Sequence, residues 1–151
     1  MYFVNIFSGS SSYLTITTPF LSSQPEEITH HLHLKIINFM DSDMPYMLKW
    51  RGVDTGLVEL PVEWLLDDWP HFETNRMNPK QVWDLWKPEW DGIYSLGRYF
   101  GLTCHPQCIG RISRLDMLER LLVDAKERGD VWFPTCKELA DWTRKKSETQ
   151  A

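Results

Sequence analysis

Short β-rich runs alternate along the chain with longer segments whose apolar residues recur at helical spacing. The β-rich runs cover residues 47–50, 57–62, 100–104 and 131–133. In the segment that follows Ser113, four leucines and an alanine fall on one face of a helix. Strands that alternate with helices in this way predict parallel strands covered by helices, which is an α/β layer or barrel architecture.

Pairs of residues with the spacing of helix N-termini predict where three helices begin: Asn78–Pro79, Ser113–Asp116 and Thr135–Glu138. The first helix is expected to end at Pro88, because proline ends or kinks a helix. A further turn or helix is expected between residues 90 and 96. Gly129 is expected to end the second helix, since glycine favours the conformation that follows a helix C-terminus.

The first 36 residues differ from the rest of the chain. They are rich in Ser and Thr and dominated by turn signals, with one short strand expected at residues 13–17. We expect residues 1–36 to be an irregular leader, residues 37–146 to form one domain, and residues 147–151 to be a tail. The histidines at residues 30–33 lack the i,i+4 spacing of a helical zinc site, so a surface cluster is expected there.

Composition and charge exclude several classes of partner. The net charge of −5, without a dominant cluster of Lys and Arg, argues against a nucleic-acid-binding surface. No apolar stretch has the length of a membrane-spanning helix, and the start of the chain lacks the pattern of a signal peptide. Three cysteines without a framework of pairs fit a reducing compartment. We therefore expect a cytoplasmic protein with no nucleic-acid or membrane partner.

Candidate chemistry gathers after two of the predicted strands. In barrels of parallel strands, functional groups lie on the loops at the carboxyl ends of the strands. His105 follows the strand at residues 100–104, and an acidic and aromatic loop at residues 64–69 follows the strand at residues 57–62. Five of the eight tryptophans lie between Trp64 and Trp90, and tryptophan both fills cores and lines ligand clefts. Cys104 and Cys108 flank His105, but no second Cys/His pair has zinc-site spacing, so no metal site is predicted.

Four segments together resemble a known family: ELPVEWLLDDWPHF, PEWDGIY, LTCHPQCIGRISRL and VWFPTCKELADW. They resemble the C-terminal half of polysaccharide deacetylases with the NodB homology domain, in the branch with peptidoglycan-deacetylase-like and allantoinase-like members. The resemblance runs from about residue 37 to about residue 145. It implies a partial distorted (β/α) barrel of the glycoside hydrolase/deacetylase type. It also implies hydrolysis of amide C–N bonds in an N-acetylated glycan or a related amide substrate.

The resemblance also implies roles for individual residues. His105 matches the late family histidine that protonates the leaving nitrogen. Asp68, on the adjacent loop, is expected as the acidic partner that keeps the imidazole protonated. The expected substrate-binding residues are Trp64, Asp67, Trp69 and Arg111. Trp69 matches the wall of the acyl pocket; Arg111 and Arg114 would hold a polar group of the substrate, although a helix-start or surface role is equally open.

The metal of the family is expected to be absent from this chain. In the family, one Asp and two His in the N-terminal half hold a divalent metal, usually zinc, whereas residues 1–36 contain no Asp. We expect a truncated protein that is inactive alone, with an open barrel edge that favours self-association. Two alternatives are a non-catalytic carbohydrate- or partner-binding remnant and a metal-free allantoinase-like amidohydrolase.

Overall fold

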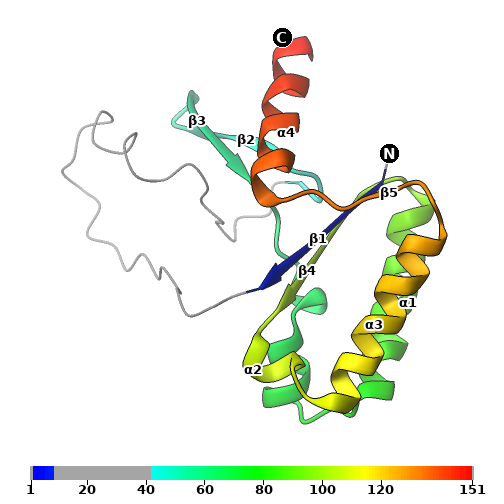
Figure 1. Cartoon of the computed structure of the whole chain (residues 1–151). Helices are drawn as coiled ribbons and strands as arrows, with labels where there is room; N and C mark the ends of the chain where they lie inside the picture. The colour runs from blue at the N-terminus through cyan, green and yellow to red at the C-terminus, as the bar shows by residue number, and fades with distance from the viewer. Residues whose placement is uncertain (1, 9–41, 151) are drawn as a thin grey trace.

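The computed structural model describes residues 2–8 and 42–150 (Figure 1). The strands are β1 (Tyr2–Ser8), β2 (Tyr46–Trp50), β3 (Val53–Glu59), β4 (Tyr99–Cys104) and β5 (Val131–Trp132). The helices are α1 (Pro79–Ser95), α2 (Pro106–Ile109), α3 (Ile112–Glu127) and α4 (Cys136–Gln150). The strand expected at residues 13–17 and the histidines at residues 30–33 lie outside the described residues.

Three parallel strands form a sheet in the order β4-β1-β5. The register of β1 on β4 runs from Phe3 opposite Tyr99 to Ser8 opposite Cys104, and Tyr2 lies opposite Val131 of β5. The prediction of parallel strands at residues 100–104 and 131–133 is confirmed. The prediction of an irregular leader is wrong for Tyr2–Ser8. The backbone amides and carbonyls of this segment pair with two neighbouring strands, and such long-range pairing is not visible in the local sequence.

The strands β2 and β3 form an antiparallel hairpin apart from the sheet. Trp50 pairs with Val53 across a two-residue turn in which Arg51 and Gly52 both have positive φ, at 51° and 81°. Such a turn matches the twist of a hairpin and reverses the chain at once. The prediction of a parallel strand at residues 57–62 is therefore wrong: this strand begins four residues earlier, ends at Glu59 and runs antiparallel to β2.

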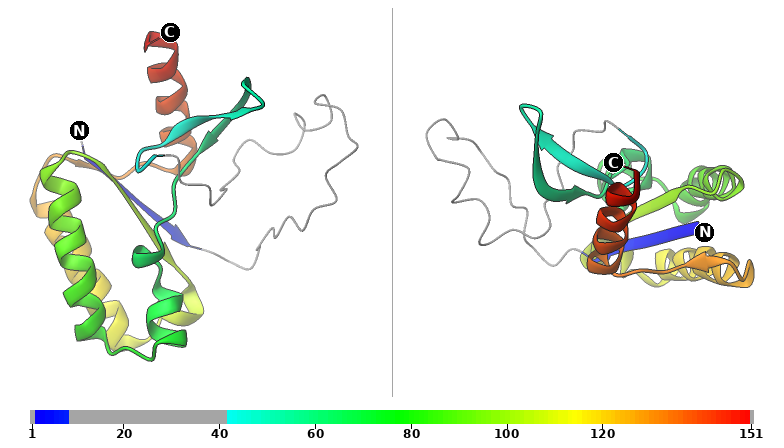
Figure 2. Two further views of the ribbon diagram at one scale, coloured as in Figure 1. Left: turned by 180° about the vertical axis from the view of Figure 1, so that it is seen from behind. Right: turned by 90° about the horizontal axis from the view of Figure 1, so that it is seen from above.

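The helices α1 and α3 pack against each other and run side by side in Figure 1 and in the left view of Figure 2. At the start of α1, Asn78 and Gln81 form a reciprocal capping box, as the Asn-Pro signal predicted. The predicted end at Pro88 is wrong, since α1 continues through this exposed proline to Ser95. Trp86 and Trp90, two residues before and two residues after Pro88, are both buried in the hydrophobic core, and their burial stabilises the unbroken helix.

The other two helix signals have different outcomes. Thr135 and Glu138 form the predicted capping box, with the Glu138 amide donating to Thr135 Oγ1 and the Thr135 amide donating to the Glu138 carboxylate. The predicted box at Ser113 and Asp116 is wrong, because the N-cap of α3 lies two residues earlier, at Arg111, and has no side-chain cap.

The ends of α3 and α4 test two further predictions. Gly129, with a φ of 80°, follows the end of α3 as predicted. The last helix, α4, packs on the hairpin and continues through Gln150, so residues 147–150, which were predicted to be a tail, are helical. Among the described residues, no helix combines the length and the apolar character that crossing a membrane requires.

Two hydrophobic clusters meet at β4. The larger one lies between the sheet and the helices α1 and α3, and it includes Trp86, Phe100, Leu102 and Leu121. The smaller one lies between the hairpin and α4 and consists of Val58, Leu60, Tyr99, Leu139 and Ala140. Alternate residues of β4 point to opposite faces, so Tyr99 joins one cluster and Phe100 the other. The strand β4 therefore ties the two clusters together and ends at Cys104, directly before His105.

Candidate active site

The candidate site lies at the carboxyl end of β4. His105 follows the last residue of this strand and is buried. The segment that carries Asp67 and Asp68 follows a 3-10 turn at Trp64–Leu66 and runs beside β4, with Asp67 in a parallel bridge to Thr103. The predicted meeting of the acidic loop with His105 at one edge of the sheet is confirmed.

Asp68 and His105 make two direct contacts. Asp68 Oδ1 lies 2.6 Å from His105 Nδ1, and Asp68 Oδ2 accepts a hydrogen bond of 3.0 Å from the backbone amide of His105. Asp68 has no solvent-exposed surface, so water does not compete for its oxygens. A carboxylate only accepts hydrogen bonds, so with an ionised Asp68 the proton of the side-chain contact belongs to Nδ1. This arrangement fixes both the orientation of the ring and the position of its proton.

Asp67 is a second carboxylate beside the same ring. Its Oδ1 lies 3.8 Å from His105 Nδ1 and accepts a hydrogen bond of 2.8 Å from the Trp69 amide. Burial raises the pKa of Asp67, and this effect outweighs the opposing effects of the Trp69 hydrogen bond and of His105. A neutral Asp67 is therefore easier to reach here than for an aspartate in water.

Asp68 and His105 are called the acid pair below. Trp69 and Trp64 lie close to this pair along the chain, and the ring of Trp69 contacts the His105 ring. The Trp69 ring meets the His105 ring edge-on, with centroids 5.6 Å apart, and is 41% exposed. Trp64 is 66% exposed at the start of the 3-10 turn. Both indoles therefore offer apolar surface to solvent near the acid pair.

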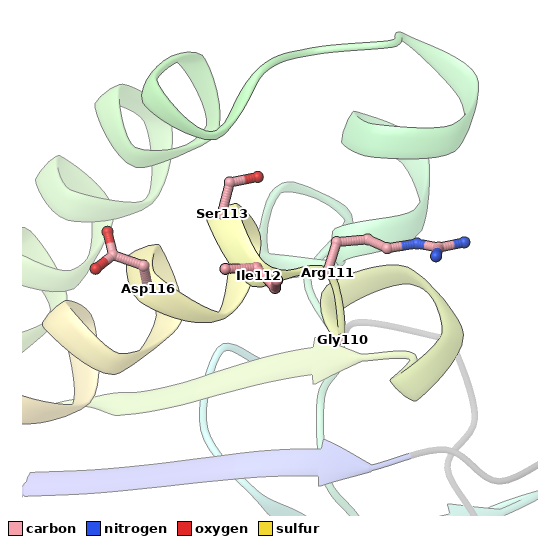
Figure 3. A pocket seen from close by; sticks show the side chains of 5 residues that line it. All are labelled: Gly110, Arg111, Ile112, Ser113 and Asp116. Atoms are coloured by element: carbon pink, nitrogen blue, oxygen red, sulfur yellow. The ribbon is translucent and has the colours of Figure 1, made fainter.

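Arg111 lies elsewhere, at the turn between α2 and α3. It lines an open hollow of about 740 Å³ with Gly110, Ile112, Ser113 and Asp116. In Figure 3 its guanidinium extends away from Ser113 and Asp116. None of the residues lining this hollow belongs to the acid pair, and no described contact joins Arg111 to His105. The structure therefore gives no support to the predicted substrate-binding role of Arg111.

Arg114 and Cys108 support the acid pair, and their parts were not predicted from the sequence. Arg114 Nη1 donates hydrogen bonds to the Cys108 carbonyl, at 2.7 Å, and to the Glu73 carboxylate, at 2.8 Å. The Cys108 thiol contacts the Asp68 carbonyl oxygen at 3.7 Å, and burial raises its pKa to about 12. Arg114, for which a substrate-binding role and a helix-start or surface role were equally open, joins α3 to Cys108 of α2 and to Glu73 of the turn at Pro70–Thr74.

The distances alone would allow a metal ion near the acid pair, although the sequence predicted no metal ligand. Asp67, Asp68 and His105 each offer one ligand atom, and these atoms lie within 4.8 Å of one another. The hydrogen bonds argue against this use. A metal on His105 Nδ1 would displace the proton that Asp68 Oδ1 accepts at 2.6 Å, and Asp68 Oδ2 is already bound to a backbone amide. As they are hydrogen-bonded here, the three residues form an acid–imidazole pair, Asp68 and His105, with a second carboxylate beside it.

Comparison with known proteins gives one curated relative and several solved structures. No protein-family model matches the chain. A peptidoglycan deacetylase from Helicobacter pylori is 31% identical over 101 residues, which cover 60% of this chain and 34% of that protein. The chain thus spans about a third of the length of this relative.

The similar solved structures carry related names. One from Mycobacterium smegmatis, named as a polysaccharide deacetylase, has a TM-score of 0.62 at 31% identity and covers 76% of this chain and 41% of its own. A second from Pseudomonas aeruginosa, also named as a polysaccharide deacetylase, has a TM-score of 0.62 at 23% identity, covering 74% of this chain and 39% of its own. The PuuE allantoinase shares the fold at 22% identity, with a TM-score of 0.65, covering 78% and 39%. Over the portion that it shares with them, the chain is thus similar in sequence and fold to proteins named as peptidoglycan and polysaccharide deacetylases.

Proposed function

We propose that the chain carries the acid–histidine part of a polysaccharide deacetylase site, with His105 as the proton donor and Asp68 as its anchor. The observation that carries this proposal is the contact of 2.6 Å between Asp68 and His105 at the end of β4. The relatives named as deacetylases support the reaction class, hydrolysis of an amide C–N bond. The parallel order β4-β1-β5 supports the partial barrel that this proposal includes.

The chemistry asked of His105 is proton transfer. The nitrogen of an amide leaves poorly unless it is protonated as the C–N bond breaks, and an imidazolium is suited to supply that proton near neutral pH. With Nδ1–H bound to Asp68, the other ring nitrogen, Nε2, is the atom that acts on the substrate. The negative charge of Asp68 stabilises the imidazolium before the transfer.

The substrate class proposed for this site is an N-acetylated glycan. The exposed face of Trp69, next to the His105 ring, supports a wall for the acetyl group or the sugar. Trp64 would extend this apolar surface by a second indole.

A second candidate is glycan binding without turnover. The observation that favours it is the exposure of Trp64 and Trp69 at one edge of the molecule. Aromatic rings of this kind hold sugars by stacking and need no proton donor. The two candidates therefore differ in whether His105 matters once the glycan is bound.

The full chain and N-acetylglucosamine oligomers provide the first test. We expect the oligomers to shift the NMR signals of the Trp69 indole and the His105 ring, and Trp69→Ala to remove this response. Trp50→Ala is the control, because Trp50 is also an exposed tryptophan but lies on the hairpin. Unchanged signals at millimolar oligomer would contradict both candidates.

Acetate release separates the two candidates. The matched segment can be exchanged into the Helicobacter pylori relative. There, His105→Ala is expected to lower turnover by roughly 10²–10⁴-fold with little change in substrate affinity, the usual contribution of general acid catalysis. Binding that persists with near-normal turnover in His105→Ala would reject the proton-donor role and leave glycan binding.

A further inference from the structure

His71 is a buried histidine that takes no part in the contact between Asp68 and His105. It lies in a π-helical turn at Pro70–Thr74 and is 6% exposed. Its Nε2 lies 2.8 Å from the carbonyl oxygen of Leu65. A carbonyl oxygen only accepts, so Nε2 carries the proton and donates it. The other ring nitrogen, Nδ1, is buried and has no hydrogen-bond partner among the described residues.

The Leu65 carbonyl oxygen accepts a second hydrogen bond, from Trp86. The indole Nε1 of Trp86 donates to it at 2.8 Å, and the rings of Trp86 and His71 meet edge-on with centroids 6.3 Å apart. Trp86 belongs to α1 and is fully buried. Two side chains from two different elements therefore converge on one backbone oxygen.

This backbone oxygen lies just before the acidic residues. Leu65 precedes Asp67 by two residues and Asp68 by three, within a segment whose backbone must place both oxygens of Asp68 on His105. The segment is also held by the bridge between Asp67 and Thr103 and by a weak thiol contact from Cys108. The two hydrogen bonds to Leu65 are thus the strong polar anchors of this segment on the side of α1.

We propose that His71 is a positioning residue for the acid pair and acts through the Leu65 carbonyl. Its donated bond, shared with Trp86, fixes the turn from which Asp68 reaches His105. The catalytic importance of the acid pair rests on the proposed function, whereas the effect of His71 on the contact between Asp68 and His105 does not.

Two substitutions separate the hydrogen bond from the space that the ring fills. In His71→Gln, the side-chain amide can donate to the Leu65 oxygen from close to the position of Nε2, whereas His71→Phe keeps a ring of similar size and removes the donor. The readout is the NMR signal of the His105 Nδ1 proton in the full chain, which a short bond to Asp68 shifts far downfield. We expect His71→Gln to retain this signal and His71→Phe to lose it or move it upfield.

Substitutions of two tryptophans in α1 test whether the effect runs through Leu65. Trp86→Phe removes the second donor to the Leu65 oxygen and is expected to disturb the His105 signal as His71→Phe does. Trp90→Phe is the control: it removes an equally buried indole whose bond goes to Asp124, at 2.6 Å, and is expected to lower the melting temperature without moving the His105 signal.

Two results would overturn the proposal. One is a His105 signal that stays unchanged in both His71→Phe and Trp86→Phe. The other is an equal disturbance in Trp90→Phe, which would mean that any loss of core stability has the same effect. If His71→Phe fails to fold, the His105 signal is compared in the other three variants. The proposal then requires the signal to be retained in His71→Gln and Trp90→Phe and disturbed in Trp86→Phe. Glycan binding and acetate release play no part in this readout, so failure of the proposed function remains a separate result.

Discussion

The carboxyl group of Asp67 is costly to ionise where it lies, because burial raises its pKa. Stability that depends on protonated Asp67 is present below the unfolded-state pKa of about 3.9 and is lost as the pH rises through the higher folded-state pKa. We therefore expect Asp67→Asn to be more stable than the native chain at pH 7, with a difference that shrinks toward pH 4. Urea denaturation at both pH values measures the two free energies of unfolding.

Asparagine at position 67 keeps an Oδ1 acceptor for the Trp69 amide, so the substitution changes charge more than geometry. Asp54 offers a matched control. Its Oδ1 accepts from the amide two residues on, at 2.8 Å, but its side chain is exposed. Asp54→Asn is expected to show no such gain. If Asp67→Asn raised the free energy of unfolding equally at both pH values, the gain in stability would not come from the ionisation of Asp67.

Two tyrosines, Tyr99 buried and Tyr46 half-buried, provide a second test at this scale, since their hydroxyls differ in pairing. The hydroxyl of Tyr99 is buried without a hydrogen-bond partner among the described residues, whereas the hydroxyl of Tyr46 donates to the buried Glu59 at 2.7 Å. An unpaired buried polar group costs about 1–3 kcal/mol. We expect Tyr99→Phe to raise the free energy of unfolding by about 1 kcal/mol and Tyr46→Phe to lower it by about 1–3 kcal/mol.

Thermal and urea unfolding of the two tyrosine variants measure these changes. Both variants lose the same atom from the same residue type, and they differ in the partner of the hydroxyl and in its burial. A loss of stability in Tyr99→Phe would mean that this hydroxyl has a partner, such as a bound water, that the direct contacts do not include.

The acid pair could be predicted from the sequence, but the residues that hold it in position could not. His105 and Asp68 could be predicted because a polar residue just after an apolar strand lies at the carboxyl end of that strand. His71 and Arg114 could not be predicted, since their partners are the backbone carbonyls of Leu65 and Cys108. The position of a backbone carbonyl depends on the whole fold and has no signature in residue type.

At the scale of elements, α1 depends on its reciprocal cap. The side chain of Asn78 accepts from the Gln81 amide at 3.0 Å, and the Gln81 side chain accepts from the Asn78 amide at 2.9 Å. Loss of an N-cap side chain typically costs about 1 kcal/mol. We expect Asn78→Ala to lower the free energy of unfolding by about this amount, as measured in urea.

Asn78→Asp serves as the control for the cap, because aspartate keeps the acceptor and adds a charge that suits the helix N-terminus. Its stability is expected to equal or exceed that of the native chain. If Asn78→Ala and Asn78→Asp lose the same stability, the capping bonds are not what stabilises this end of α1.

Local sequence signals predicted several helix boundaries correctly. The predictions were wrong where tertiary packing or a tight turn determined where an element ends. The caps at Asn78 and Thr135 worked because both partners lie within four residues. The break at Pro88 did not occur, since burial of Trp86 and Trp90 outweighs the one helical bond that proline cannot make. The hairpin was missed because the positive φ of Arg51 is rare for a residue that is not glycine.

At the scale of the whole molecule, β1 joins parts of the sheet that do not otherwise meet. The order β4-β1-β5 places β1 between two strands that are not paired with each other. Ser8 at the end of β1 lies opposite Cys104, the residue before His105. The N-terminal strand therefore contributes both to the continuity of the sheet and to the edge at which the acid pair lies, although nothing in the local sequence of residues 1–36 predicted this.

This position of β1 can be tested by a proline at its centre. Ile6 lies opposite Leu102, and a central-strand proline removes a ladder hydrogen bond and distorts the pairing on both sides. We expect Ile6→Pro to speed hydrogen exchange in β4 and β5 at least about tenfold, which corresponds to a local loss of about 1.4 kcal/mol. The hairpin β2–β3 forms a separate sheet, so its exchange should stay unchanged and serves as an internal control. Because β4 leads directly into His105, the NMR signal of the His105 Nδ1 proton should weaken in the same variant. Native exchange rates in both β4 and β5 would show that β1 does not hold the sheet together, and the acid pair would then depend on β4 and the acidic loop alone.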